Sequence, residues 1–290
     1  MKIIRTVAEM QTHADQQRME GRVLALVPTM GSLHEGHLSL VRCAKAEADH
    51  VTVSIFVNPT QFGPGEDFEA YPRDFQRDCK LLEEVGGVST IFAPSEATLY
   101  PEGSGQQCVW VTCPEMSQQL CGKYRSGHFR GVLTVVMKLF AACKPHIGVF
   151  GLKDIQQYIL LKRMVQDLAL DIKIIGGETA RELNGLAYSS RNKYLTADER
   201  SQASVISKAI NSATRMIEDG EESPMAVTGM IQEMIHSVPQ AKLQYAEIVT
   251  ASRLEPVEQF MPDMEVIVAV AVYFQHTRLI DNAFALVPAQ

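Results

Sequence analysis

Residues 24–40 read LALVPTMGSLHEGHLSL, the most informative segment of the chain for its architecture. The short apolar run Leu24 to Val27 is typical of a buried parallel strand. Pro28 and Gly31 interrupt that pattern, and from Leu38 onward the apolar spacing favours a helix. The motif His-Glu-Gly-His therefore lies where a strand passes into a helix.

The two histidines of this motif are candidates for contacting a phosphate group. His34 and His37 are three residues apart, so they are neighbours on one helical turn. A helix N-terminus offers backbone N–H groups and a partial positive charge, both of which suit phosphate. Each imidazole can donate a hydrogen bond or carry a positive charge, and Gly36 lets a ligand approach the backbone.

Two other interpretations stay open for the histidine pair: surface residues at a helix start, or metal ligands. For a metal, no third ligand is suggested nearby, and Glu35 between the histidines does not reproduce the zinc-protease pattern. The arrangement of strand, turn, His-x-Gly-His and helix resembles the nucleotide-binding signature of the adenylyl-transferring superfamily that includes class I aminoacyl-tRNA synthetases.

Length and composition indicate a globular chain of one or two domains. The chain has 290 residues, 46% of them apolar, and a net charge of −7, which argues against general nucleic-acid binding. No apolar run approaches the ~20 residues that span a bilayer, and the N-terminus lacks the apolar core of a secretory signal. The six cysteines form no C-x-x-C pair. We therefore predict reduced thiols, a cytoplasmic location and no membrane partner.

Strands and helices alternate along most of the chain. The predicted strands of this part are 22–27, 51–57, 88–93, 107–112, 147–150 and 171–175. From Thr196 the character changes to two helices followed by strands at 243–249, 266–274 and 277–284. The order predicts an α/β fold: a Rossmann-like parallel-sheet domain over residues 1–184 and a smaller α+β domain over residues 185–290.

Polar residues follow several of the predicted strands, where open α/β sheets bind ligands. The loop 58–65 carries Asn58 and Gln61, although a plain turn has a similar composition. Lys153 follows the strand 147–150 at a helix start, where it suits phosphate or is simply solvated. The glycine-spaced basic loop 121–131 either meets an anion or is a solvated turn. Ser189-Ser190-Arg191 is a compact donor set for a polyphosphate, although helix capping also explains such a triplet.

Five ordered blocks together resemble the pantoate–β-alanine ligase family over nearly the whole chain. They are PTMGSLHEGHLSLVR, VSIFVNPTQFGPGEDFEAYPRD, LCGKYRSGHFRGVLTVVMKLF, FGLKDIQQ and NGLAYSSRNKYL. The resemblance implies a Rossmann-like N-terminal domain, a C-terminal lid domain carrying the Ser-Ser-Arg loop, and a homodimer.

The resemblance also implies the roles of individual residues. The catalytic residues would be His37, His34 and Lys153. The substrate-binding residues would be Gln61, Gln157, Asn58 and Tyr71. The ATP-binding residues would be Met30, Gly31, Ser32, Leu33, His34, Glu35, Gly36, His37, Gly151, Leu152, Lys153, Asp154, Ala180, Tyr188, Ser189, Ser190 and Arg191. No residue is predicted to hold a resident metal, because Mg²⁺ would arrive with ATP.

Three local departures from the family pattern affect loops. Ser126 stands where the family often has proline, which should loosen that turn. Glu178-Thr179-Ala180-Arg181 replaces the usual Pro-x-x-Arg, and Asn184-Gly185 replaces Asp-Gly. Because the family contacts adenine through the backbone at the Ala180 position, a changed side chain is tolerable there.

The implied activity is ATP-dependent condensation of pantoate with β-alanine to pantothenate, a step of coenzyme A biosynthesis. It proceeds through a pantoyl adenylate and releases pyrophosphate and AMP. Two other classes stay open: a nucleotidyltransferase, which would retain the nucleotide in its product, and a non-catalytic nucleotide-binding module, which would release no pyrophosphate. The intact set of His37, Lys153 and Ser-Ser-Arg argues against the second.

Overall fold

The computed structural model describes residues 1–289, which form two compact units. The first comprises Met1–Ser117, Tyr124–Leu152 and Leu160–Glu178. The second comprises Gln118–Lys123, Lys153–Ile159 and Thr179–Gln290, the last residue lying outside the described part. Both units therefore draw on segments that are separate in the sequence.

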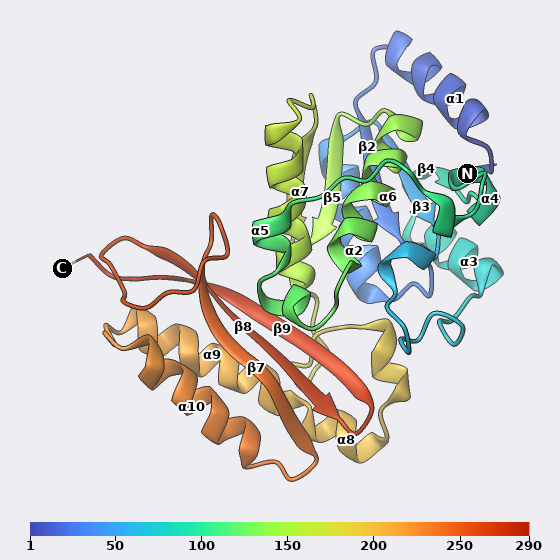
Figure 1. The fold of residues 1–290 in the computed structure, drawn as a ribbon. Coiled ribbons are helices and arrows are strands. Elements are labelled where there is room, and N and C mark those ends of the chain that lie inside the picture. The colour runs from blue at the N-terminus through green and yellow to red at the C-terminus, as the bar shows by residue number, and fades with distance from the viewer. Residues whose placement is uncertain (290) are drawn as a thin grey trace. The chain divides into compact units, whose positions relative to one another are not determined.

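The first unit is built on a six-stranded parallel sheet, of which Figure 1 labels the central strands β2, β3, β4 and β5. Its strand order is β1-β4-β3-β2-β5-β6. From β2 the chain adds β3 and β4 on one side, and it then crosses back to add β5 and β6 on the other, so the order of the strands switches between β2 and β5. Ligands bind outside the carboxyl ends of strands at such a point. The strands are β1 (Lys2–Ile4), β2 (Leu24–Thr29), β3 (His50–Ile55), β4 (Val88–Phe92), β5 (Ile147–Gly151) and β6 (Lys173–Gly177).

Helices cover both faces of this sheet because side chains alternate along buried strands. Val27 and Val53 belong to the core beneath α2 and α3, whereas Leu24 and Leu26 point to the other face, where α1 and α6 pack. The helices of the first unit are α1 (Val7–Met19), α2 (Glu35–Glu47), α3 (Phe75–Val85), α4 (Glu96–Leu99), α5 (Pro114–Ser117) and α6 (His128–Cys143). The helix α7 (Ile155–Asp167) begins in the second unit and continues in the first.

The second unit packs helices on a three-stranded antiparallel sheet of order β7-β8-β9. The buried strand residues Val266, Val268 and Val270 meet the apolar face of α9 in one core. Its elements are α8 (Ala197–Gln202), α9 (Ser204–Glu218), α10 (Pro224–His236), β7 (Ala241–Thr250), β8 (Glu265–Phe274) and β9 (Thr277–Leu286).

The predicted fold class is confirmed, with two differences in the elements. Residues 107–112 are extended but join no strand of the described sheets; Val111 N–H instead donates to Thr134 Oγ1 at 3.0 Å. Strand β1 was not predicted, because three residues give no periodic signal and it is stabilised by pairing with the distant β4. Within residues 1–289, no helix is long and apolar enough to cross a membrane.

Candidate active site

The turn Met30–Leu33 connects β2 to α2 and has an unusual backbone. Gly31 and Ser32 have φ angles of 74° and 50°, in the left-handed region. Asp78 of α3 holds this turn, accepting hydrogen bonds from Ser32 N–H and Leu33 N–H at 2.8 Å each. A Cβ on Gly31 would lie 2.8 Å from Asp78 Oδ2, so the turn requires glycine for space as well as for conformation.

His34 and His37 cap the start of α2 reciprocally. His34 Nδ1 accepts a hydrogen bond from Gly36 N–H at 3.2 Å, and His37 Nδ1 accepts one from His34 N–H at 3.4 Å. The ring centroids are 4.1 Å apart. Since Nδ1 accepts in both rings, a neutral ring carries its proton on Nε2. Nε2–H is therefore the group that each ring can present to a phosphate oxygen.

Gln61 and Asn58 form one hydrogen-bonded unit at the carboxyl end of β3. Gln61 Nε2 lies 2.9 Å from Met30 Sδ, so the ends of β2 and β3 meet here. Asn58 is 1% exposed and donates to Gln61 Oε1 and Gly131 O, while its Oδ1 accepts from Tyr100 Oη and Thr60 Oγ1. These contacts fill the capacity of the Asn58 amide. Asn58 therefore orients Gln61.

The basic loop before α6 meets an anion of its own unit, Glu66. Arg125 donates from Nε and Nη2 to the two carboxylate oxygens of Glu66, both at 2.7 Å. Burial alone would raise the pKa of Glu66, but the hydrogen bonds and charge of Arg125 outweigh it and lower the pKa to about 2. Arg125 Nη1 also donates to His128 Nε2, which leaves Nδ1–H of His128 to donate to Gln61 O at 2.7 Å. This contact chain fixes the backbone of Gln61.

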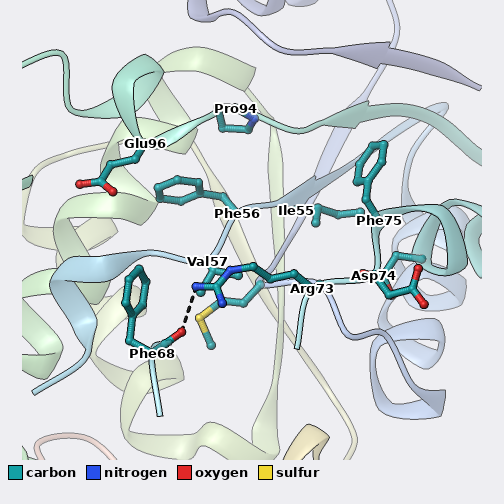
Figure 2. Close-up of a pocket in the computed structure, with 12 residues that line it drawn as sticks. Ile55, Phe56, Val57, Phe68, Arg73, Asp74, Phe75, Pro94 and Glu96 are labelled. Atoms are coloured by element: carbon teal, nitrogen blue, oxygen red, sulfur yellow. Dashed lines mark hydrogen bonds between the residues drawn. The ribbon is translucent and has the colours of Figure 1, made fainter. Parts of the chain in front are cut away.

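A cavity of about 370 Å³ lies beside the turn, between α3 and the ends of β3 and β4 (Figure 2). The Arg73 guanidinium crosses it and donates to the carbonyls of Phe68, Glu69 and Tyr71 (Figure 2 shows the first bond). Tyr71 is buried and packs edge-on against Phe62. The cavity is lined by Met30, Gly31, Ile55, Phe56, Val57, Phe68, Arg73, Asp74, Phe75, Asp78, Pro94 and Glu96.

Lys153 belongs to the second unit, whereas Gly151 and Leu152 belong to the first. Residues Leu152–Asp154 form one 3₁₀ turn between β5 and α7. The Lys153 side chain is 19% exposed, and its Nζ lies 3.6 Å from Asp154 Oδ1. This exposure does not fit a fully solvated helix start. Gln157 lies in the first turn of α7, in the same segment of the second unit.

The predicted adenine and phosphate loop also lies in the second unit. Ala180 O accepts from Tyr188 N–H at 2.9 Å, which closes the loop at its base. Ser189 Oγ accepts from Arg191 N–H at 3.3 Å and so caps the 3₁₀ helix Ser190–Tyr194. Ser189 therefore acts as a helix cap, as one of the two interpretations of this triplet predicted. A capping serine can still contact a phosphate group, so the phosphate role stays a prediction. Asn184 Oδ1 accepts from Leu186 N–H, a bond that an aspartate could also accept.

The predicted residues fall into two sets. The first unit contains Met30–His37, Asn58, Gln61 and Tyr71, and direct contacts join Met30, Gln61 and Asn58. The second unit contains Lys153, Asp154, Gln157, Ala180 and Tyr188–Arg191.

The sequence pattern assigned no role to Glu66 or Asp78, and it singled out Arg125 and His128 only as part of the basic loop 121–131. The basic loop was recognised, but its anion was not. A single aspartate on a helix gives no sequence signal that its carboxylate caps a distant turn.

Comparison with known proteins gives a consistent result. Residues 2–284 match the family model described as pantoate-beta-alanine ligase. The chain is 53% identical over 292 residues to a pantothenate synthetase of Salinibacter ruber, covering 99% of each chain. It is 48% identical over 282 residues to a pantothenate synthetase of Thermotoga neapolitana, covering 97% of this chain and 99% of that one.

Solved structures agree. The crystal structure of pantothenate synthetase from Thermus thermophilus matches with a TM-score of 0.89 and 38% identity, covering 98% of this chain and 99% of that one. A pantoate-beta-alanine ligase from Francisella tularensis, complexed with beta-gamma ATP and beta-alanine, matches with a TM-score of 0.78 and 35% identity over 98% of this chain and 97% of that one. With the turn, the paired histidines and the Gln61 loop in place, the chain belongs to the pantoate–β-alanine ligase family.

Proposed function

We propose that this chain joins pantoate to β-alanine in two steps, with the residue roles set out here. In the first step a pantoate carboxylate oxygen attacks the α-phosphorus of Mg-ATP, and the bond to the bridging oxygen of pyrophosphate breaks. In the second step the β-alanine amine attacks the acyl carbon of pantoyl adenylate, the acyl–oxygen bond breaks, AMP leaves and the amine loses a proton. Neither step needs a nucleophile from the protein.

His34 and His37 stabilise the negative charge of the phosphates in the first step. Their Nδ1 atoms are occupied by backbone N–H groups, so Nε2–H of each ring is aimed by the helix start rather than by a flexible loop. Donors that are fixed before the reaction cost no reorganisation when charge develops. This fixed orientation of the two rings is the observation that carries the proposal.

Lys153, Ser189, Ser190 and Arg191 supply the remaining cations and donors toward the triphosphate. Their presence in one compact unit supports a common role. Charge develops on the leaving pyrophosphate, so these groups act more strongly in the transition state than in the bound ground state. The proposed ATP site is completed by Gly151, Leu152, Asp154, Ala180 and Tyr188. Residues 185–290 act as its lid.

Gln61 and Gln157 bind pantoate through neutral amides, which orient its hydroxyl and carboxylate without changing the charge of the nucleophile. Asn58 supports Gln61 through the 3.1 Å bond between their side chains, and Tyr71 closes the same loop.

We assign the protein to the cytoplasm and to a homodimer. Val109, an apolar side chain in the irregular segment 107–113, is 77% exposed, and we propose that a second copy of the chain covers it. Sedimentation velocity tests the dimer directly.

Omission of each substrate in turn tests the activity. The protein should form AMP and pyrophosphate at full rate only with ATP, a divalent cation, pantoate and β-alanine all present. A nucleotidyltransferase would show no dependence on β-alanine. Full-rate AMP release without β-alanine contradicts the ligase assignment.

Substitution of Lys153 and His37 tests the phosphate roles. Lys153→Ala and His37→Ala should each lower the rate of pyrophosphate release by ~100-fold or more in a single turnover, comparable to losing one oxyanion donor. The dissociation constant of ATP, measured by calorimetry, should change much less. Lys162→Ala, at an exposed lysine of the helix α7 that follows the Lys153 turn, is the matched control and should stay within ~2-fold. Near-normal pyrophosphate release in Lys153→Ala removes this lysine from the site.

A further inference from the structure

Two consecutive polar residues, Asp281 and Asn282, are buried in the middle of strand β9, with apolar residues on both sides. Asp281 is 3% exposed and Asn282 is 6% exposed. Neighbouring residues of a strand point to opposite sides, so the pair reaches two different segments. A buried polar side chain without a partner costs ~1–3 kcal/mol, so the partners of these two side chains indicate why polar residues occupy this strand.

Asn282 holds the backbone of the lysine that we place on the phosphates. Its Nδ2 donates to Lys153 O at 2.8 Å, across 129 residues of sequence. Lys153 is the central residue of the 3₁₀ turn Leu152–Asp154. Fixing its carbonyl fixes the orientation of the following peptide and restricts the direction in which the Lys153 side chain leaves the backbone.

Asp281 holds the second phosphate segment in a similar way. Its carboxylate accepts from Arg181 Nη1 at 2.7 Å and from Arg181 Nη2 at 3.0 Å, a paired geometry that fixes orientation. Arg181 also donates to Gly185 O at 3.1 Å and forms a backbone bridge with Ala187. The chain then continues into Ser189-Ser190-Arg191, whose 3₁₀ helix contacts β9.

The two side chains are linked to each other through the strand. Asn282 N–H donates to Asp281 Oδ1 at 2.8 Å, so the carboxylate that receives Arg181 also fixes the backbone of Asn282. Lys153, Arg181 and β9 all belong to the second compact unit. One dipeptide therefore contacts the segments that carry both sets of predicted phosphate donors.

We propose that Asp281-Asn282 is a positioning element that keeps Lys153 in register with the Ser189–Arg191 loop during adenylate formation. Neither residue touches substrate in this assignment; Asn282 acts through Lys153, and Asp281 acts through Arg181. The inference rests on the proposed role of Lys153.

A double-mutant cycle tests the action of Asn282 through Lys153. Asn282→Ala should lower the single-turnover rate of pyrophosphate release by about 10-fold or more, with little change in the ATP dissociation constant. In a Lys153→Ala background the same substitution should change the rate less than ~2-fold, because the group it positions is already gone. Thr277→Val, at the start of the same strand, is the control and should leave the rate unchanged.

Two further variants keep the test decisive if Asn282→Ala folds poorly. Asn282→Asp keeps the shape of the side chain but removes the donor when ionised, and it should behave like Asn282→Ala. Asn282→Ser keeps a donor and should retain more activity; thermal unfolding of each variant reports on folding. Normal pyrophosphate release in Asn282→Asp, or an equal further loss in the Lys153→Ala background, overturns the inference. Near-normal release in Lys153→Ala alone instead overturns the role proposed for that lysine.

Discussion

At the scale of single residues, the Gln61 side chain shows how much of the site depends on its neighbours. Its Oε1 accepts from Asn58, its Nε2 contacts Met30 Sδ, and its backbone carbonyl accepts from His128. Gly131 packs against the peptide bond that joins Thr60 to Gln61. A Cβ at position 131 would clash with the Thr60 carbonyl oxygen, so a larger residue there would displace this backbone. The amide is therefore held in place on several sides, which would lower the entropy cost of binding the pantoate that we propose for it.

Gln61→Ala should weaken the use of pantoate more than the binding of ATP. Loss of one amide hydrogen-bond partner costs ~1–3 kcal/mol, which corresponds to roughly 5-fold to 150-fold in the KM for pantoate. Initial-rate kinetics with pantoate varied at saturating ATP measure this effect, and calorimetry measures ATP binding. Gln76→Ala, an exposed glutamine on α3, is the matched control. An unchanged KM for pantoate in Gln61→Ala removes Gln61 from the substrate site.

At the scale of elements, α3 supports the turn that delivers the two histidines. Asp78 is 1% exposed, and burial raises the pKa of its carboxyl group although two backbone N–H groups oppose that change. The carboxylate has one oxygen for each of Ser32 N–H and Leu33 N–H. Helix α3, which lies between β3 and β4 in the chain, thus fixes the backbone conformation of the turn that follows β2, directly before His34.

Asp78→Asn should impair both stability and catalysis. The amide can accept only on its oxygen, so its NH₂ group would face one of the two backbone N–H groups, at a cost of ~1–3 kcal/mol in the free energy of unfolding. The displaced turn should also lower the rate of adenylate formation. Asp74→Ala removes the N-cap of the same helix and should cost about 1 kcal/mol while leaving the rate within ~2-fold. Equal catalytic losses in the two variants contradict a specific role for Asp78.

At the scale of the whole molecule, buried titratable groups make the first unit sensitive to acid. His50 and His13 both contact Thr90 Oγ1, at 3.1 and 3.0 Å. Burial and the neighbouring His13 lower the pKa of His50 from 6.5 to about 4. The folded protein thus binds fewer protons at His50 than the unfolded chain does between these values. The free energy of unfolding therefore falls as the pH falls from 6.5 to about 4.

Glu66 extends this sensitivity to lower pH. Its pKa in the folded state is about 2, against 4.5 as its ordinary value, so its salt bridge with Arg125 stabilises above 4.5 and is lost as the pH falls toward 2. Well above pH 6.5, where His50 is neutral in the unfolded chain as well, neither group contributes a slope.

His50→Gln should reduce the pH dependence of stability. The difference in the free energy of unfolding between about pH 7 and pH 4 should shrink by on the order of 2 kcal/mol. Urea unfolding followed by the fluorescence of Trp110, the one tryptophan of the chain, reports on the first unit. An identical pH dependence in the variant and the unaltered protein would show that His50 does not control it.

The order and spacing of residues along the chain are sufficient to predict the class of fold and the residues at the strand ends. Apolar strands alternating with amphipathic helices specify a parallel sheet, and polar residues that follow such strands come to one edge of it. Local spacing and the resemblance over the whole chain were sufficient for these features and for the position of His34 and His37 at a helix start. The reciprocal capping of α2 by the two rings was not predicted, although all its partners lie within three residues.

The partners that hold those residues are selected when distant elements pack against one another. Asp78 beneath the Gly31 turn, Glu66 on Arg125 and Asn282 on Lys153 are contacts between segments 46, 59 and 129 residues apart. A carboxylate or amide on a helix or strand has the same local appearance whether it faces solvent or a distant backbone group. Its partner is fixed when the elements pack, because a buried polar group must find a hydrogen bond there. The assignment of Lys153 to the second compact unit follows from such packing, not from its place in the sequence.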